Sequence, residues 1–186
     1  MKVKSIPNRL ASRPVCSGAA AALGIWLFSA AAAMAGPLPD WMTVKPSSKL
    51  LMLALDAGVG EANGALNFNG HHDGSHKIVV PQGWTVVVRM KNFDARVPHS
   101  ALVTRVYKQE EMPEKLGPQD TVFPGAATPV PFNGTAAGGY AEFTFAAATA
   151  GQYFIACGVH THLQAGMWLK LEIAEGISAP DWQHSH

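Results

Sequence analysis

Apolar and polar residues alternate with a period of two along much of the chain after residue 50. The clearest example is YAEFTFA (140–146), in which Tyr140, Glu142 and Thr144 fall on one face and the intervening alanine and phenylalanines on the other. Successive side chains of a β-strand point to opposite faces of the sheet, so this pattern predicts a strand with one buried face.

Similar short runs, rich in β-branched residues and ended by Gly, Pro or Asn, recur along the rest of the chain, where helical periodicity is weak. The predicted strands are residues 48–58, 65–70, 76–80, 84–93, 99–107, 140–146, 152–158 and 166–174. Short strands at such regular spacing are typical of an antiparallel β-sandwich or barrel. We therefore expect an all-β fold.

Residues 108–139 interrupt this pattern. The segment holds five prolines and six charged residues, and we predict a long loop with one helical turn around EEMPEK (110–115). Loops of this length are uncommon unless they are functional or disordered. The C-terminal residues APDWQHSH (179–186) are predicted to be loosely ordered, as chain ends often are.

The N-terminal residues 1–35 have the pattern of a secretory signal peptide. Four basic residues and no acidic residue precede the apolar run GAAAALGIWLFSAAAA (18–33), which is too short and Ala-rich for a confident membrane span. Ala33-Met34-Ala35 then forms a small-x-small cleavage site before Gly36. The alternative is an uncleaved N-terminal anchor. In both cases we expect residues 36–186 to form a single exported domain, periplasmic or secreted.

Cleavage changes the charge and the cysteine content. The 14 Lys and Arg residues fall to ten while all 13 acidic residues remain, so the formal net charge changes from +1 to −3. No basic stripe survives, which argues against a nucleic-acid partner. Cleavage also removes Cys16 and leaves Cys157 alone. An unpaired exported cysteine indicates an intermolecular bridge, a buried inert thiol, a metal ligand or a nucleophile.

The neighbours of Cys157 favour a metal ligand. In CGVHTHLQAGMW (157–168), the thiol is followed by two imidazoles and a thioether. A cysteine nucleophile needs an oriented base, and no Asn or Asp stands in an obvious place to orient one. Structural zinc rarely uses Met, whereas two His, one Cys and a weak axial Met form the blue-copper arrangement. His99, at the start of a predicted strand, is the best candidate for a ligand from outside this segment.

These motifs resemble those of the cupredoxin superfamily, and within it the sulfocyanins, with rusticyanin more distant. The resemblance covers roughly residues 50–174, and it implies a Greek-key β-sandwich with the copper ligands His99, Cys157, His162 and Met167. The stretches that carry it are LNFNG (66–70), VVPQGWTVVVRMKN (79–92), PHS (98–100), FPGAATP (123–129) and, above all, CGVHTHLQAGMW (157–168).

The second histidine of the site has two candidates. His160 has the spacing from Cys157 that plastocyanin-like proteins use, but the pattern Cys-x4-His-x4-Met of sulfocyanins selects His162, five residues before Met167. His160 would then be a solvated loop residue. Alternatively, it adds a ligand and makes a more tetragonal, red copper site.

Other polar residues receive more ordinary interpretations. The histidines of HHDGSH (71–76) are interpreted as part of an exposed bend, and the less favoured alternative is a second copper or zinc site. His184 and His186 are interpreted as solvated residues of the C-terminal tail. Ser100 either tunes the copper through a hydrogen bond or is an ordinary strand residue. Trp168 is expected to pack at the core or rim.

A closed site of four protein ligands suits electron transfer better than catalysis, because catalytic metals keep an open position. We therefore predict a non-enzymatic carrier that shuttles single electrons, with one type 1 copper per chain and His162 as the exit. A small docking patch is expected, formed by Val97, Pro98, Leu163, Ala165 and Gly166. The resemblance implies a cytochrome or a terminal oxidase as partner.

Three other functions stay open on the sequence. The first is an open or red-copper site with an enzymatic or small-molecule-sensing role, which azide or nitric oxide binding would reveal. The second is a copper chaperone or storage protein, which would release Cu(I) readily to a chelator. The third is a binding module that has lost its metal, against which the complete ligand set argues.

Overall fold

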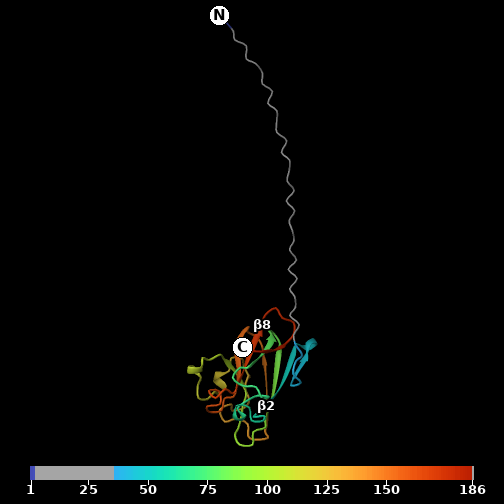
Figure 1. Ribbon diagram of the computed structural model, residues 1–186. Coiled ribbons are helices and arrows are strands. Elements are labelled where there is room, and N and C mark those ends of the chain that lie inside the picture. Colours follow the sequence, from blue (N-terminus) through green and yellow to red (C-terminus); the bar gives the residue numbers. More distant parts are fainter. Residues whose placement is uncertain (3–35, 186) are drawn as a thin grey trace. The chain divides into compact units, whose positions relative to one another are not determined.

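Two β-sheets packed face to face make up the fold. The computed structural model describes residues 1, 2 and 36–185, and the predicted signal peptide and Cys16 lie outside these residues. The strand order is β1-β2-β4-β6 in the first sheet and β5-β7-β8-β3-β9 in the second. Figure 1 labels one strand of each sheet, β2 and β8. Within the described part of the chain, no helix has the length and hydrophobicity needed to cross a membrane.

The bounds of the elements follow the sequence pattern closely for most strands. The first sheet contains β1 (Met42–Lys45), β2 (Leu50–Ala57), β4 (Thr85–Asn92) and β6 (Tyr140–Ala146). The second sheet contains β5 (Leu102–Arg105), β7 (Gly151–Ala156), β8 (Trp168–Ala174), β3 (His76–Pro81) and β9 (Asp181–His184). The helical elements between residues 36 and 185 are short 3-10 turns: η1 (Pro46–Ser48), η2 (Ala62–Ala65), η3 (Gln109–Glu111) and η4 (Pro118–Asp120).

The predicted all-β Greek-key sandwich is confirmed, but the expectation that it is purely antiparallel is wrong. β2 runs parallel to β4, and β3 runs parallel to β8. The chain passes from β2 in the first sheet to β3 in the second and returns to the first with β4. The two parallel pairs therefore join strands that are not consecutive in the chain, whereas the consecutive neighbours β1 and β2, and β7 and β8, pair antiparallel.

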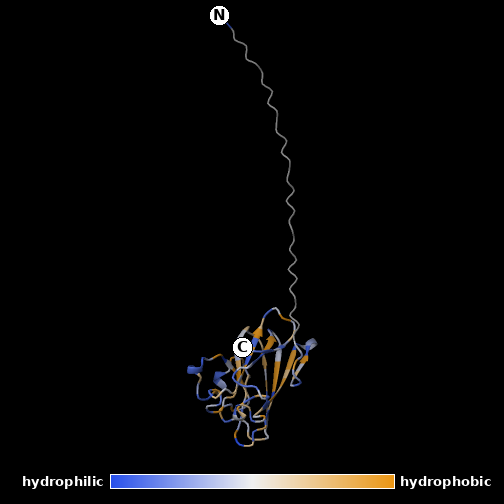
Figure 2. Cartoon of the chain, in the orientation of Figure 1, coloured by the Kyte–Doolittle hydropathy of each residue, from blue (hydrophilic) through white to orange (hydrophobic). Residues whose placement is uncertain are grey.

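The alternating residues form the core between the sheets. Leu51, Leu53 and Leu55 of β2 are completely buried, and in β6 the predicted apolar face is buried while Tyr140 and its face are exposed. Figure 2 shows the strands largely in the hydrophobic colour. Burial of an apolar side chain contributes about 1.5–3 kcal/mol, so this two-faced pattern supplies the driving force for the sandwich.

Two of the predicted features are corrected by the structure. Residues 65–70 are not a strand, because the Asn67 side chain bonds the backbone locally: Oδ1 accepts from the N–H groups of Val59 and Gly70, and Nδ2 donates to the Val59 carbonyl. Such side-chain bonds compete with strand pairing. The C-terminal residues were predicted to be loosely ordered, but residues 181–184 form β9, which pairs antiparallel with β3. β1 was also absent from the predicted strands.

The long loop of residues 108–139 packs against the second sheet. Its turn η3 begins one residue before the predicted helical turn. The loop residues Met112 and Leu116 join a second buried cluster with Phe154 of β7 and Leu163. The Leu116 N–H donates to the Gly158 carbonyl at 3.0 Å. The loop therefore braces the segment that follows Cys157.

Candidate metal centre

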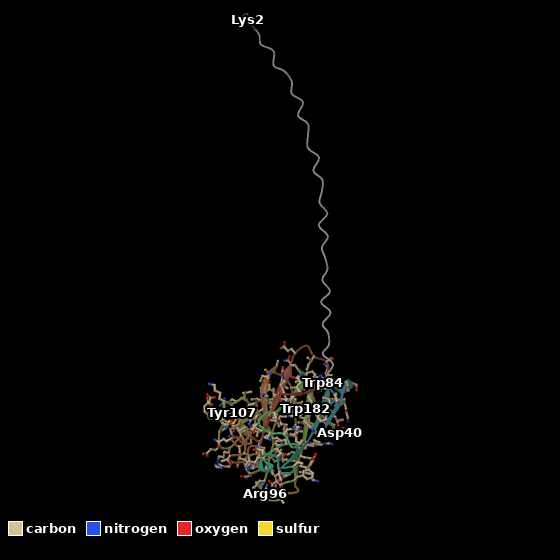
Figure 3. All side chains as sticks on the ribbon, in the orientation of Figure 1. Lys2, Asp40, Trp84, Arg96, Tyr107 and Trp182 are labelled. Carbon is tan, nitrogen blue, oxygen red and sulfur yellow. The ribbon has the colours of Figure 1, made fainter. Side chains whose placement is uncertain are left out.

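Three of the predicted ligands meet at one end of the sandwich. His99 lies just before β5, Cys157 directly after β7, and His162 in the loop that leads to β8. One donor atom from each lies within 4.8 Å of the others, and all three residues are buried. Figure 3 labels Arg96, in the loop that precedes His99, and Trp84, just before β4 at the opposite end.

The His99 ring is fully buried, and neither of its nitrogens has a hydrogen-bond partner. Nε2 lies 3.6 Å from Oδ2 of the buried Asp94, too far for a hydrogen bond, and Nδ1 has no hydrogen-bond partner either. Burial lowers the pKa of His99, against the opposing effect of Asp94. Because an unsatisfied buried polar atom is costly, the two orphaned nitrogens indicate a site built for another ligand.

Gly58 creates the space that the His99 ring needs. Its φ is +75°, and a Cβ at this position would lie 2.6 Å from the Asp94 Cβ and 3.1 Å from His99 Nε2. Any side chain at residue 58 would collide with this pair. The loop after β2 therefore makes room for the site because residue 58 has no side chain.

Cys157 and His162 face each other in the same buried space. Cys157 Sγ lies 3.4 Å from His162 Nδ1. Burial, followed by the charge of His99, lowers the pKa of His162 to about 4, so its imidazole is neutral over most of the pH range. Burial raises the pKa of the Cys157 thiol. A bound cation would reverse this effect, since coordination deprotonates a thiol.

The backbone closes the segment 157–167 into a loop that brings Met167 back to Cys157. The Cys157 N–H donates to the Met167 carbonyl at 3.0 Å, and the Met167 N–H donates to the His162 carbonyl at 2.9 Å. The Met167 side chain is completely buried. The four predicted residues therefore lie near each other, two of them linked through the backbone to Met167.

His160 lies outside this group. Its side chain is 62% exposed, and its Nε2 lies 3.2 Å from a carboxylate oxygen of Glu114 in the long loop. The alternative in which His160 adds a fourth strong ligand therefore has no support from the geometry.

Ser100 connects His99 to Cys157. The Ser100 N–H donates to Cys157 Sγ at 3.4 Å, and the Ser100 hydroxyl lies 3.7 Å from the same sulfur. The hydroxyl oxygen also accepts from the Gly158 N–H at 2.8 Å. Of the two interpretations of Ser100, the structure favours the one in which its hydrogen bonds hold the thiol.

Replacing Ser100 with alanine is expected to lower the free energy of unfolding by about 1–3 kcal/mol, because the buried Gly158 N–H loses its acceptor. Urea denaturation of the metal-free protein measures this effect. Ser48→Ala is the matched control, since that hydroxyl donates to the Lys45 carbonyl at an exposed turn, and we expect a smaller loss there. Equal losses in the two variants would contradict the role assigned to Ser100.

The predicted docking patch is only partly at the surface. Leu163 and Gly166 are buried, Val97 and Pro98 are half-buried, and Ala165 is exposed. Leu163 is buried because it joins the cluster under the long loop.

Trp168 packs as predicted, stacked on Phe154 with ring centroids 4.1 Å apart.

Sequence reasoning missed the apolar residues that the long loop adds to this end. Val130 and Phe132 are 46% and 43% exposed. The loop reaches the site through a pair of backbone hydrogen bonds between His99 and Thr135. His99 and Thr135 are 36 positions apart along the chain (135 − 99), and such a pair is hard to find from sequence, although the apolar residues between the prolines were a signal.

The donor set fits copper better than other common metals. Thiolate and thioether are soft ligands, imidazole is borderline, and oxygen donors of the kind that hard cations require are absent from the cluster of described residues. The orphaned nitrogens of His99 are consistent with a metal held at this point.

Comparison with known proteins identifies the family of this chain. The sequence model of the sulfocyanin (SoxE) domain matches residues 40–183. The sulfocyanin of Sulfolobus acidocaldarius is 30% identical over 143 residues, which is 72% of this chain and 68% of that protein. All four predicted ligands lie within the residues that the family matches.

Comparison with solved structures gives further matches at low similarity. An auracyanin from Roseiflexus castenholzii has a TM-score of 0.49 and 24% identity, covering 66% of this chain and 96% of its own. The rusticyanin of Thiobacillus ferrooxidans has a TM-score of 0.43 and 17% identity, covering 73% of this chain and 87% of its own.

Proposed function

This chain belongs to the sulfocyanin family, and we propose that it is a blue-copper electron carrier of the cupredoxin type. The proposed ligands are His99, Cys157, His162 and Met167. The observation that carries the proposal is the buried group of two imidazoles and one thiol in which both nitrogens of His99 lack a hydrogen-bond partner.

Bound copper supplies a one-electron couple between Cu(I) and Cu(II). The chain's contribution is to hold the donors in place and to exclude water from them. Ser100 holds the Cys157 sulfur, Asp94 lies beside the His99 ring, and the long loop braces the segment that carries the other ligands. A closed, dry site of this kind supports electron transfer rather than substrate chemistry.

We propose His162 as the point where electrons leave, because it is 8% exposed whereas His99 and Cys157 are completely buried. Val97 and Pro98 are half-buried and Val130 and Phe132 of the long loop are exposed. The long loop approaches this end of the molecule, where its Gly134 lies beside Pro98. A small apolar area suits brief contacts with a redox protein. A cytochrome or a terminal oxidase remains the proposed partner.

We further propose that residues 1–35 are removed during export and that residues 36–186 form one domain in the periplasm or outside the cell. The free and buried Cys157 supports a ligand role over an intermolecular disulfide, since a buried thiol cannot link subunits.

The visible absorption spectrum of residues 36–186 with one equivalent of Cu(II) tests the proposed function. We expect an intense blue band that disappears on addition of ascorbate and returns on reoxidation. A red or yellow-green product would indicate a more tetragonal or open site and would return enzymatic or sensing roles to consideration. The absence of colour, with Cys157 still reactive towards a thiol reagent, would refute the copper proposal.

Replacing Asp94 with asparagine is expected to raise the reduction potential of the bound copper by on the order of 50 mV, which for one electron corresponds to about 1 kcal/mol of Coulomb energy. Burial opposes ionisation of Asp94, but hydrogen bonds from Arg96 outweigh it and lower the pKa, so the residue is a carboxylate. A negative charge 3.6 Å from His99 Nε2 favours Cu(II) over Cu(I), and its removal has the opposite effect.

Redox titration of the copper-loaded protein measures this shift. Glu110→Gln removes a carboxylate from an exposed residue of the long loop, where solvent and salt screen it, and it should leave the potential nearly unchanged. A fall in the potential of the Asp94→Asn protein would contradict the assignment.

A further inference from the structure

Three imidazoles meet on the surface of the second sheet, apart from the buried group that contains Cys157. His76 begins β3 and lies directly opposite His184 of β9 in the antiparallel register. His71, from the preceding bend, packs its ring 4.3 Å from the His76 ring. Trp182, labelled in Figure 3, lies on the same strand as His184. The HHDGSH bend and the C-terminal residues therefore form one cluster.

The spacing of two ring nitrogens in this cluster matches that of two ligands on one metal ion. His76 Nε2 lies 3.2 Å from His184 Nδ1. Zinc binds imidazole nitrogen at about 2.0–2.1 Å with tetrahedral angles, which places two bound nitrogens about 3.3 Å apart. The small shift needed to admit an ion makes this pair a ready chelate.

The surrounding residues hold His76 in the orientation that a ligand needs. Its second ring nitrogen, Nδ1, lies 3.2 Å from the Ser75 hydroxyl. Metal-binding histidines usually fix the ring in this way, through a hydrogen bond at the other nitrogen. The Trp182 ring stacks on the His76 ring, with centroids 4.7 Å apart and an angle of 6° between the ring planes.

The imidazoles are also in the state that binds metal. Partial burial, followed by the charges of neighbouring histidines, lowers the pKa of both His71 and His76. Their rings are therefore neutral near pH 7, as coordination requires. His76 is half-buried and His184 is exposed, so an ion can reach the pair from solvent.

We propose that this cluster is a second metal site, which binds a divalent transition-metal ion of the zinc type through His76 Nε2 and His184 Nδ1, with His71 beside them as a third imidazole. The remaining positions of the ion are open to water. The site differs from the buried group in its chemistry, since it has no thiolate and admits solvent.

Isothermal titration of the protein with Zn²⁺, without an added affinity tag, tests this proposal. Wild-type protein is compared with His76→Phe, which keeps an aromatic ring against Trp182 but removes the nitrogen, and with His184→Gln. We expect the Kd of this site for Zn²⁺ to rise at least about tenfold in each variant. His160→Ala removes an exposed imidazole that pairs with Glu114, and it should bind as the wild type does.

The comparison isolates this site, because any zinc held by the buried group is the same in wild type and variants. Far-UV circular dichroism confirms that the variants are folded. If wild type, His76→Phe and His184→Gln bind zinc with the same stoichiometry and affinity, the pair is only a hydrogen-bonded imidazole contact and the proposal is wrong. The result is independent of whether the buried group binds copper.

Discussion

Replacing Cys157 with serine is expected to abolish the blue colour of the copper-loaded protein completely. The colour of such a site arises from charge transfer between a thiolate and Cu(II), and a serine hydroxyl does not ionise to replace the thiolate. Cys157 is the free cysteine of the described residues, and its side chain is completely buried. Residues 36–186 contain no second cysteine that could take its place.

The measurement is the visible spectrum of the Cys157→Ser protein after addition of one equivalent of Cu(II). Thermal unfolding of the metal-free variant provides the control, because serine is nearly the same size as cysteine and the Ser100 N–H still has an acceptor. We expect the fold to survive. A blue band of undiminished intensity in this variant would rule out Cys157 as the ligand and with it the proposed site.

Replacing His162 with alanine is expected to bleach the blue band, whereas replacing His160 with alanine is expected to leave it unchanged. His162 Nδ1 lies 3.4 Å from Cys157 Sγ within the buried group, and its removal opens a path for water to the metal. His160 instead contacts Glu114 at the surface, and an exposed pair of this kind contributes at most about 1 kcal/mol to stability.

The two variants are compared by their visible spectra and reduction potentials under identical copper loading. Adding free imidazole to the His162→Ala protein should restore part of the blue band, since His162 borders solvent and its removal leaves a space of the right shape. The reverse pattern, in which the His160→Ala protein bleaches and the His162→Ala protein stays blue, would show that the ligand assignment is wrong.

The sequence predicted the buried residues of the strands, and its spacing singled out His162, which lies in the buried group, rather than the exposed His160. Both features depend on spacing within short segments. The alternation of YAEFTFA identifies the buried face of β6 directly. The distance from His162 to Met167 reflects a loop that closes on itself through backbone hydrogen bonds. Local patterns of this kind can be recognised without knowledge of the rest of the fold.

Features that join distant residues were not predictable. The contact of Asp94 with His99 depends on the absence of a side chain at Gly58, which lies more than 30 residues earlier (94 − 58 = 36). The burial of Leu163 depends on Met112 of the long loop, 51 residues earlier in the chain (163 − 112). The pairing of His76 with His184 joins β3 to the last strand, so the HHDGSH bend looked like an ordinary exposed turn. Each of these depends on which strands lie side by side.

The pairing of strands that are far apart in sequence has a kinetic consequence. Lys77 of β3 lies opposite Lys170 of β8, and His76 lies opposite His184, so the second sheet requires closure of loops that span about half of the chain. High contact order of this kind slows folding, typically to milliseconds or seconds. Cys157 follows β7, whose partner β8 completes the sheet only together with β3. Until the sheet closes, the Cys157 thiol remains exposed to solvent, and it becomes buried only on folding.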